Sequence, residues 1–256
     1  MLSSWTRRRV TTPRSRRLVA RQLDALTLRT AQEYVGKVDH EIVGLYEART
    51  PSATTLGSIS QAHVTFFGSG DVYRGIPPEG LAVPLDMEAM RRNEPTSSGR
   101  YELNGDTVSC VWETGDTTEC SFSRPDWIRD LYNGHYGRCH CREDLRLSGL
   151  YRFSQEFPFQ LRFTEDGGFT NARPGLLELI GRMRWARDVA RDPRYVTLAS
   201  HDVGSGTYRV LSNTLALRYD DGREANIPFW TGVGDVNPDD AQVVSLQSYN
   251  FTRIGD

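Results

Sequence analysis

The chain has little lysine, few cysteines and no long apolar run. Lys37 is the only lysine among 31 basic residues, and 4 cysteines are spread over 256 residues. The nearly exclusive use of arginine fits a GC-rich bacterial genome. No apolar stretch approaches the roughly 20 residues that a membrane-spanning helix needs, so we expect no membrane association. With 38% hydrophobic and 25% charged residues, the chain can bury a sizeable core as a globular protein.

The sequence also lacks the motifs of familiar catalytic and cofactor sites. It contains no GxSxG elbow, no HExxH pair, no Walker loop and no dinucleotide-binding fingerprint after a strand. His201 and Asp202 form an acid/base pair only if both side chains converge on a pocket, and adjacent residues of an extended chain point to opposite sides. We therefore interpret this pair as a loop feature, assign no catalytic residue and expect no cofactor.

Charge is unevenly distributed along the chain. Seven arginines and no acidic residue lie in the first 23 residues, so the remainder carries a net charge of about −9. A folded body this acidic is poorly suited to nucleic acid. The basic leader lacks the apolar segment of a secretory signal. It is either a mitochondrial presequence or an unstructured start, and we favour the second and expect a cytoplasmic protein.

The chain contains an internal repeat. Residues 98–122 align without a gap onto residues 205–229. Identical pairs include Gly99 and Gly206, Tyr101 and Tyr208, Thr107 and Thr214, Gly115 and Gly222, and Phe122 and Phe229. The similarity extends upstream, where 64–70 align with 161–167, and downstream to the end of each unit. Each unit then spans about 100 residues, enough to close a core of its own.

Within each unit apolar residues alternate with polar ones, as they do in half-buried strands. Val108, Cys110 and Trp112 show this alternation in the first unit. Glycines at 115 and 222 mark tight turns, because glycine accepts a positive φ. We predict roughly six to eight short strands per unit, in a meander sandwich or barrel. Helical periodicity occurs between the third and fourth strands, at 85–90 and at 176–186, and again near the N-terminus, after residue 23.

Each unit begins with Gly-x-aromatic and ends with aromatic-x-Arg, a signature that resembles that of lipocalins and related calycin barrels. The residues are Gly44, Tyr46, Tyr136 and Arg138 in the first unit and Gly149, Tyr151, Phe251 and Arg253 in the second. Tyrosine stands where the family motif has tryptophan. The resemblance implies that the last-strand arginine lies over the first-strand ring at the closed end of each barrel. We call these pairs, Tyr46 with Arg138 and Tyr151 with Arg253, the latches.

The repeat and the resemblance together predict an all-β dominated chain of four segments. Residues 1–40 form a basic tail and an N-terminal helix, 41–138 the first lipocalin-like unit, 139–145 a linker and 146–256 the second lipocalin-like unit. Each unit is expected to be an antiparallel barrel with a short helical insert. The same pattern is similar to that of uncharacterised bacterial lipocalin-like proteins.

The cysteines admit a disulfide or a metal site. Cys110 and Cys120 occupy positions that are Leu217 and Ile227 in the second unit. We therefore interpret them as buried thiols, although they are close enough on adjacent strands for a disulfide. A second group, at the end of the first unit, is His135, Cys139, His140 and Cys141. This dense cluster lacks the two-part spacing of structural zinc sites, so we interpret it as linker and predict no metal.

The two units differ most in the helical insert of the second. Arg182 and Trp185 lie in this insert, and His201 follows it near the expected barrel mouth. A helix above the mouth can act as a lid whose arginines hold an acidic or aromatic ligand. A solvated helix face, with acidic partners four residues away, explains the same residues without a ligand. Trp185, Arg182 and His201 are the candidate ligand-binding residues.

Two functions from different classes remain open. The first is binding of a hydrophobic or peptidic small molecule, or of a protein partner, by a tandem lipocalin-like scaffold in natural product biosynthesis. The second is a cofactor-independent cyclase or isomerase that shapes a reactive substrate in a barrel pocket. An ionisable pair within hydrogen-bond reach inside a pocket would favour the second.

Overall fold

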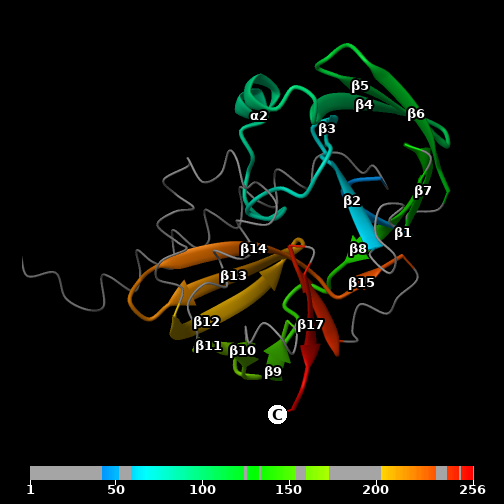
Figure 1. The fold of residues 1–256 in the computed structure, drawn as a ribbon. Coiled ribbons are helices and arrows are strands. Elements are labelled where there is room, and N and C mark those ends of the chain that lie inside the picture. Colours follow the sequence, from blue (N-terminus) through cyan, green and yellow to red (C-terminus); the bar gives the residue numbers. More distant parts are fainter. Residues whose placement is uncertain are drawn as a thin grey trace, which may run out of the picture.

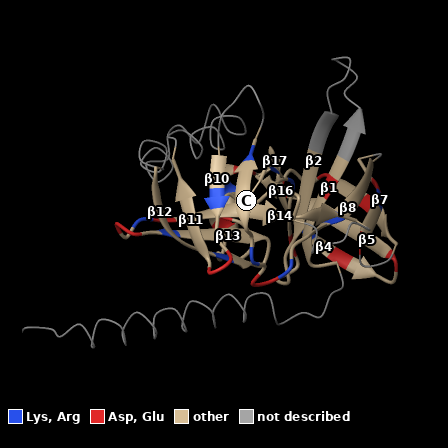
Figure 2. Ribbon diagram, turned by 90° about the horizontal axis from the view of Figure 1, so that it is seen from below, with Lys and Arg blue, Asp and Glu red and all other residues tan. Residues whose placement is uncertain are grey.

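A computed structural model describes residues 42–51, 59–123, 126–132, 134–153, 160–172, 203–234, 241–247 and 249–255. These residues form two closed antiparallel barrels of eight strands each. The barrels lie side by side in two perpendicular views (Figure 1, Figure 2). The β-dominated fold predicted from the period-two patterns is confirmed. The expected N-terminal helix and the insert at 176–186 lie outside the described residues.

The first barrel is an up-and-down meander that closes on itself. Its strands are β1 (Gly44–Pro51), β2 (Ile59–Phe66), β3 (Asp71–Tyr73), β4 (Ser98–Asn104), β5 (Thr107–Trp112), β6 (Thr117–Phe122), β7 (Trp127–Leu131) and β8 (Gly134–His140). Each strand pairs with the next, and β8 returns to β1, where Arg138 lies opposite Tyr46. Closure removes the free edges that a flat sheet would expose.

The helical insert of the first unit lies between β3 and β4 as α2 (Met87–Asn93). The Asp86 side chain caps the helix by accepting a hydrogen bond from the backbone N–H of Ala89 at 2.9 Å. Met87 packs on Phe67 and Tyr73 at the barrel wall. The insert is therefore fastened to the barrel through its first turn.

The second barrel repeats this order and adds one short strand. Its strands are β9 (Gly149–Arg152), β10 (Gln160–Phe163), β11 (Gly168–Asn171), β12 (Gly204–Leu211), β13 (Thr214–Tyr219), β14 (Glu224–Trp230), β16 (Val243–Leu246) and β17 (Tyr249–Arg253). Between β14 and β16, the strand β15 (Gly232–Val233) leaves this barrel and pairs with β8 of the first. The second unit thus extends the sheet of the first.

The internal repeat in the sequence corresponds to the same strand register in both barrels. In the β4–β5 hairpin, Gly99 lies opposite Trp112. In the β12–β13 hairpin, Gly206 lies opposite Tyr219. The alignment of 98–122 with 205–229 therefore matches strand with strand and turn with turn.

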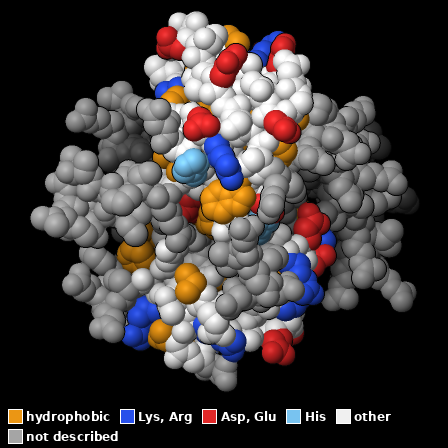
Figure 3. Space-filling model, turned by 90° about the vertical axis from the view of Figure 1, so that its right-hand side faces the viewer, with side chains coloured by type: hydrophobic (Ala, Val, Ile, Leu, Met, Phe, Trp, Pro, Cys, Tyr) orange, Lys and Arg blue, Asp and Glu red, His pale blue; other side chains and the backbone are white. Residues whose placement is uncertain are grey.

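The surface mixes charges of both signs. In Figure 2 the acidic and basic segments lie mainly at strand ends and turns. On the face seen in Figure 3, charged side chains of both signs are interspersed, and the coloured hydrophobic side chains form small separate groups. Among the described residues, no helix combines the length and the apolar content that crossing a membrane requires.

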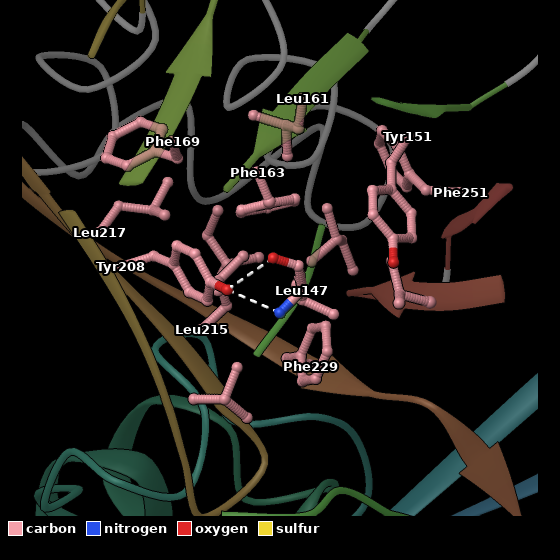
Figure 4. Packing of buried hydrophobic residues seen from close by; sticks show 14 of the residues in the cluster. Leu147, Tyr151, Leu161, Phe163, Phe169, Tyr208, Leu215, Leu217, Phe229 and Phe251 are labelled. Carbon is pink, nitrogen blue, oxygen red and sulfur yellow. Dashed lines mark hydrogen bonds between the residues drawn. The ribbon is translucent and has the colours of Figure 1, made fainter. Parts of the chain in front are cut away.

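The barrel interiors are packed with aromatic and aliphatic side chains (Figure 4). In the second barrel the ring centroids of Phe163 and Tyr208 lie 4.9 Å apart in an edge-to-face contact. The Tyr208 hydroxyl accepts a hydrogen bond from the Leu147 N–H at 2.6 Å and donates one to its carbonyl at 2.9 Å. The buried phenol is thereby satisfied, and the segment before β9 is held inside the barrel.

Candidate functional site

The latch of the first barrel brings together the residues named from the sequence signature. The Arg138 Cζ lies 5.4 Å from the centroid of the Tyr46 ring. Its Nη2 donates a hydrogen bond to the Tyr46 hydroxyl at 3.0 Å, and that hydroxyl donates to the Ile42 carbonyl at 3.1 Å. Burial raises the pKa of Tyr46 to about 12, against the opposing effect of the Arg138 charge. This end of the barrel is therefore filled by a neutral phenol under an arginine.

The corresponding residues of the second barrel meet in a different way. Arg253 and Tyr151 lie opposite each other between β17 and β9. Arg253 Nη2 donates a hydrogen bond to the Ser148 hydroxyl at 3.3 Å, and a Cβ on Gly149 would lie 2.7 Å from Arg253 Nε. The Tyr151 hydroxyl donates to the Ala241 carbonyl at 2.8 Å. Here the arginine side chain lies against the glycine backbone of the signature.

The opposite end of the first barrel carries a second arginine packed on aromatic rings. Alternate strands of an antiparallel barrel run in the same direction, so the C-terminal ends of β3, β5 and β7 meet at the end away from the start of β1. Arg74, Trp112 and Tyr132, which we call the mouth cluster, lie at or just after these three ends. The Arg74 Cζ is 4.3 Å from the Trp112 ring centroid and 4.2 Å from that of Tyr132.

The mouth cluster crosses the opening of the barrel. In a ring of eight strands β3 and β7 lie on opposite sides, so contact between Arg74 and Tyr132 spans the mouth. Arg74 Nη2 also donates a hydrogen bond to the Tyr132 hydroxyl. Trp112 is 2% exposed, whereas 39% of Tyr132 faces solvent. The cluster therefore presents one guanidinium and one ring at the surface.

Below the mouth cluster the barrel becomes apolar. The Trp112 indole N–H donates a hydrogen bond to the Thr118 hydroxyl at 3.1 Å. Cys110, Cys120 and Tyr136 are buried in the same interior cluster as Trp112. Burial raises the pKa of Tyr136, and the nearby Arg74 charge opposes this rise. The predicted pair Cys110 and Cys120 is present as free thiols in the structure.

The second barrel has different residues at the three corresponding positions. By repeat alignment and strand register, Asn171, Tyr219 and Gln247 replace Arg74, Trp112 and Tyr132. Gln247 repeats the left-handed backbone of Tyr132, with φ of 47° against 50°. Arg223 lies over Tyr219, with its Cζ 4.4 Å from the ring centroid. Its Nε, however, already pairs with Asp221 at 2.7 Å.

A buried acid–base pair lies where the two barrels meet. Glu47 and His63 face each other across β1 and β2 on the outer wall of the first barrel. Their side chains are 0% and 3% exposed, and His63 Nε2 lies 3.7 Å from Glu47 Oε2. The Trp230 indole of β14 donates a hydrogen bond to the same carboxylate oxygen at 3.1 Å. We call Glu47, His63 and Trp230 the junction cluster.

Backbone contacts reinforce the junction. Val233 of β15 lies opposite Cys139 of β8, and the Asn213 side chain donates a hydrogen bond to the Cys139 carbonyl at 3.1 Å. On another side, the Thr214 hydroxyl accepts a hydrogen bond from the Ala82 N–H at 3.0 Å. A Cβ on Gly80 would lie 2.1 Å from that hydroxyl oxygen. Close approach at the junction thus depends on glycine at position 80.

The other residues singled out from the sequence lie outside the described residues or in β8. Trp185, Arg182 and His201 lie outside the described residues, and so does Asp202. Cys139 and His140 belong to β8, where Cys139 is buried. Among the described residues no group of three or more His, Cys, Asp or Glu side chains could hold a metal ion.

The mouth and junction clusters were not identified from the sequence. None of Glu47, His63 and Arg74 belongs to a recognisable sequence motif. A usable signal was the divergence between aligned repeat positions. Arg74 aligns with Asn171, and Glu47 aligns with Arg152. Comparison with protein families, curated proteins and solved structures gives no match for this chain.

Proposed function

We propose that the chain binds a hydrophobic or amphipathic small molecule at the mouth of its first barrel, on a tandem lipocalin-like scaffold. Two closed eight-stranded barrels in tandem fit a ligand-binding scaffold in general terms. Small-molecule sites at barrel mouths combine apolar walls with a few polar groups that fix orientation. The mouth cluster has this composition.

The observation that carries the proposal is the partial exposure of the mouth cluster. Among the described residues, Tyr132 is one of the few large hydrophobic side chains with an exposed fraction above a third, at 39%. Its ring lies directly above the buried interior that contains Trp112. An exposed ring continuous with an apolar core gives a ligand a stacking surface. The opposite end is occupied by the latch, so access from that side is blocked.

The enzyme alternative lacks a comparable observation. An ionisable pair does occur, as Glu47 and His63, but it lies on the outer wall of the first barrel and is covered by Trp230. It therefore does not supply an acid or a base inside a barrel. A role in a biosynthetic pathway is a narrower proposal, and the neighbouring genes are the observation that tests it.

The experiment measures binding of the uncharged fluorescent probe N-phenyl-1-naphthylamine. We expect fluorescence enhancement with the wild type, and affinity about three- to tenfold weaker after Tyr132→Ala, because one ring contact is lost. Val111→Ala is the matched control, since Val111 is 52% exposed on the wall of the same barrel. No enhancement with the wild type, or equal binding by Tyr132→Ala and wild type, would contradict a ligand site at this end.

A further inference from the structure

We propose that Arg74 pairs with a carboxylate on the ligand, so that the first barrel selects acids with an apolar, aromatic body over neutral molecules of the same shape. This inference rests on the proposed function and names its ligand class. It depends on the donors that the guanidinium has left, on its charge balance and on the absence of the same group from the second barrel.

Arg74 carries more hydrogen-bond donors than its contacts with the two rings use. The Arg74 Cζ lies 4.3 Å from the centroid of the Trp112 ring and 4.2 Å from that of the Tyr132 ring. The two ring centroids are only 6.1 Å apart, so both rings lie to one side of the guanidinium, which carries five N–H donors. The Tyr132 hydroxyl accepts from Nη2. The other donors can form the parallel pair of hydrogen bonds that a carboxylate accepts.

The charge of Arg74 is not balanced by an acid within the described part of the chain. Its interactions there are the two ring contacts and the hydrogen bond to Tyr132, and no carboxylate oxygen lies within 4.0 Å. By contrast, Arg223 pairs with Asp221, and Arg91 pairs with Asp71 and Glu113. An arginine held in place beside a buried interior and without an acidic partner is prepared for an anionic ligand.

The ring of Tyr132 sets the preference for a flat apolar body. A carboxylate on the edge of Arg74 would bring the rest of the ligand over the exposed part of this ring. Offset stacking of two aromatic groups adds a favourable contact there. In the second barrel Asn171 takes the place of Arg74 and is 2% exposed. We therefore expect one acid-selective site per chain.

The test compares 2-naphthoate with 2-naphthalenemethanol, which share the ring system and differ in the head group. Isothermal titration calorimetry at low salt should give roughly tenfold or greater preference for the acid, with one site per chain, since charge-assisted hydrogen bonds are stronger than neutral ones. Arg74→Gln should abolish the preference by weakening acid binding alone. Arg74→Lys should keep part of it, because lysine retains the charge without the planar fork.

The control is Arg100→Gln. Arg100 is an exposed arginine on the neighbouring strand β4, outside the mouth, so its removal should leave the preference unchanged. Equal affinity of the wild type for both probes overturns the proposal even if every variant folds poorly. In that case binding of the alcohol still supports a ligand site at the mouth. Failure of both naphthalenes and of N-phenyl-1-naphthylamine would instead remove the proposed function itself.

Discussion

The two barrels share their strand order and register and differ in the side chains at their ends. Equivalent hairpins have the same register, and Tyr132 and Gln247 have the same left-handed backbone. Yet the mouth position that is Arg74 in the first barrel is a buried Asn171 in the second. Backbone geometry has been kept where strands must pair, and side chains have changed where a barrel opens. The two repeats thus have the same strand arrangement, while the residues at the barrel ends can take different roles.

The outer walls show the same divergence. The cross-strand pair Glu47 and His63 of the first barrel corresponds to Arg152 and Gln160 of the second, which also lie opposite each other. The first pair is buried under Trp230, whereas Arg152 and Gln160 are only partly buried. In the first barrel the pair lies in an interface with the second barrel, whereas the corresponding pair of the second barrel is partly open to solvent.

Removing the junction tryptophan should have the largest effect on this comparison. Trp230 is 1% exposed and donates to the Glu47 carboxylate. Trp230→Ala leaves a cavity and a buried carboxylate without this donor, so the free energy of unfolding should fall by about 3–5 kcal/mol in urea denaturation. Ser123→Ala, at the equivalent position of the first barrel, should change it by less than about 0.5 kcal/mol. Equal effects would mean that the junction contributes little.

Gly99 and Gly206, which occupy equivalent positions, test whether the two barrels are equally intolerant of a side chain there. A Cβ on Gly99 would lie 2.5 Å from the Val111 carbonyl oxygen, and one on Gly206 would lie 2.0 Å from that of Arg218. Both contacts involve backbone that cannot move aside. Gly99→Ala and Gly206→Ala should each destabilise the protein by about 3 kcal/mol, measured by the same denaturation. Gly115→Ala has open space around its Cβ but a φ of +86°, so it measures the cost of a left-handed backbone without a clash, about 1–2 kcal/mol. A mild effect at one position would show that its barrel tolerates a wider strand spacing.

Much of the arrangement of strands and turns could be predicted from the sequence because it depends on local chemistry. The alternation in Val108, Cys110 and Trp112 buries one face of β5, and glycine turns fix where strands end. The apolar character of Leu217 correctly indicated that Cys110 occupies a core position. The closure of each barrel followed from a first-strand and a last-strand signature, which is a long-range relation carried by few residues.

The mouth and the junction could not be predicted in this way. The role proposed for Arg74 depends on its contacts with the rings of Trp112 and Tyr132, which lie 38 and 58 positions further along the chain. The junction joins Glu47 to Trp230 across 183 positions. Neither contact leaves a periodic pattern, because each uses one residue per strand. The divergence between repeats marks these positions, but it does not say what they contact.

The two latches differ in what the arginine contacts, and this difference can be tested. Arg138 donates to the Tyr46 hydroxyl, whereas Arg253 donates to Ser148. Both arginines lie against the glycine of their signature. Arg138→Ala and Arg253→Ala should each cost about 2 kcal/mol, with only part regained by lysine. Ser148→Ala should weaken the effect of Arg253→Ala but not that of Arg138→Ala in a double-mutant cycle. If the effect of Ser148→Ala on the free energy of unfolding adds to that of Arg253→Ala as it does to that of Arg138→Ala, the two latches do not differ in this contact.

The last difference concerns alkaline pH, where the latch phenol of the first barrel titrates. The pKa of Tyr46 is raised from 10.0 to about 12 in the folded protein, mainly by burial. Between these values the unfolded chain loses the proton while the folded chain keeps it, so stability falls as pH rises. The slope from this residue approaches about 1.4 kcal/mol per pH unit. In Tyr46→Phe this contribution is absent.

The stability advantage of wild type over Tyr46→Phe should therefore shrink by about 2 kcal/mol between pH 10 and 12. It is measured as the difference in urea midpoints multiplied by the m-value, the slope of the unfolding free energy against urea concentration. The other buried tyrosines titrate in both proteins and cancel in this difference. Val111→Ala, which alters no ionisable group, should run parallel to the wild type over the same range. Parallel curves for Tyr46→Phe would mean that the phenol under Arg138 is not held neutral by burial, and that the closed end of the first barrel admits water.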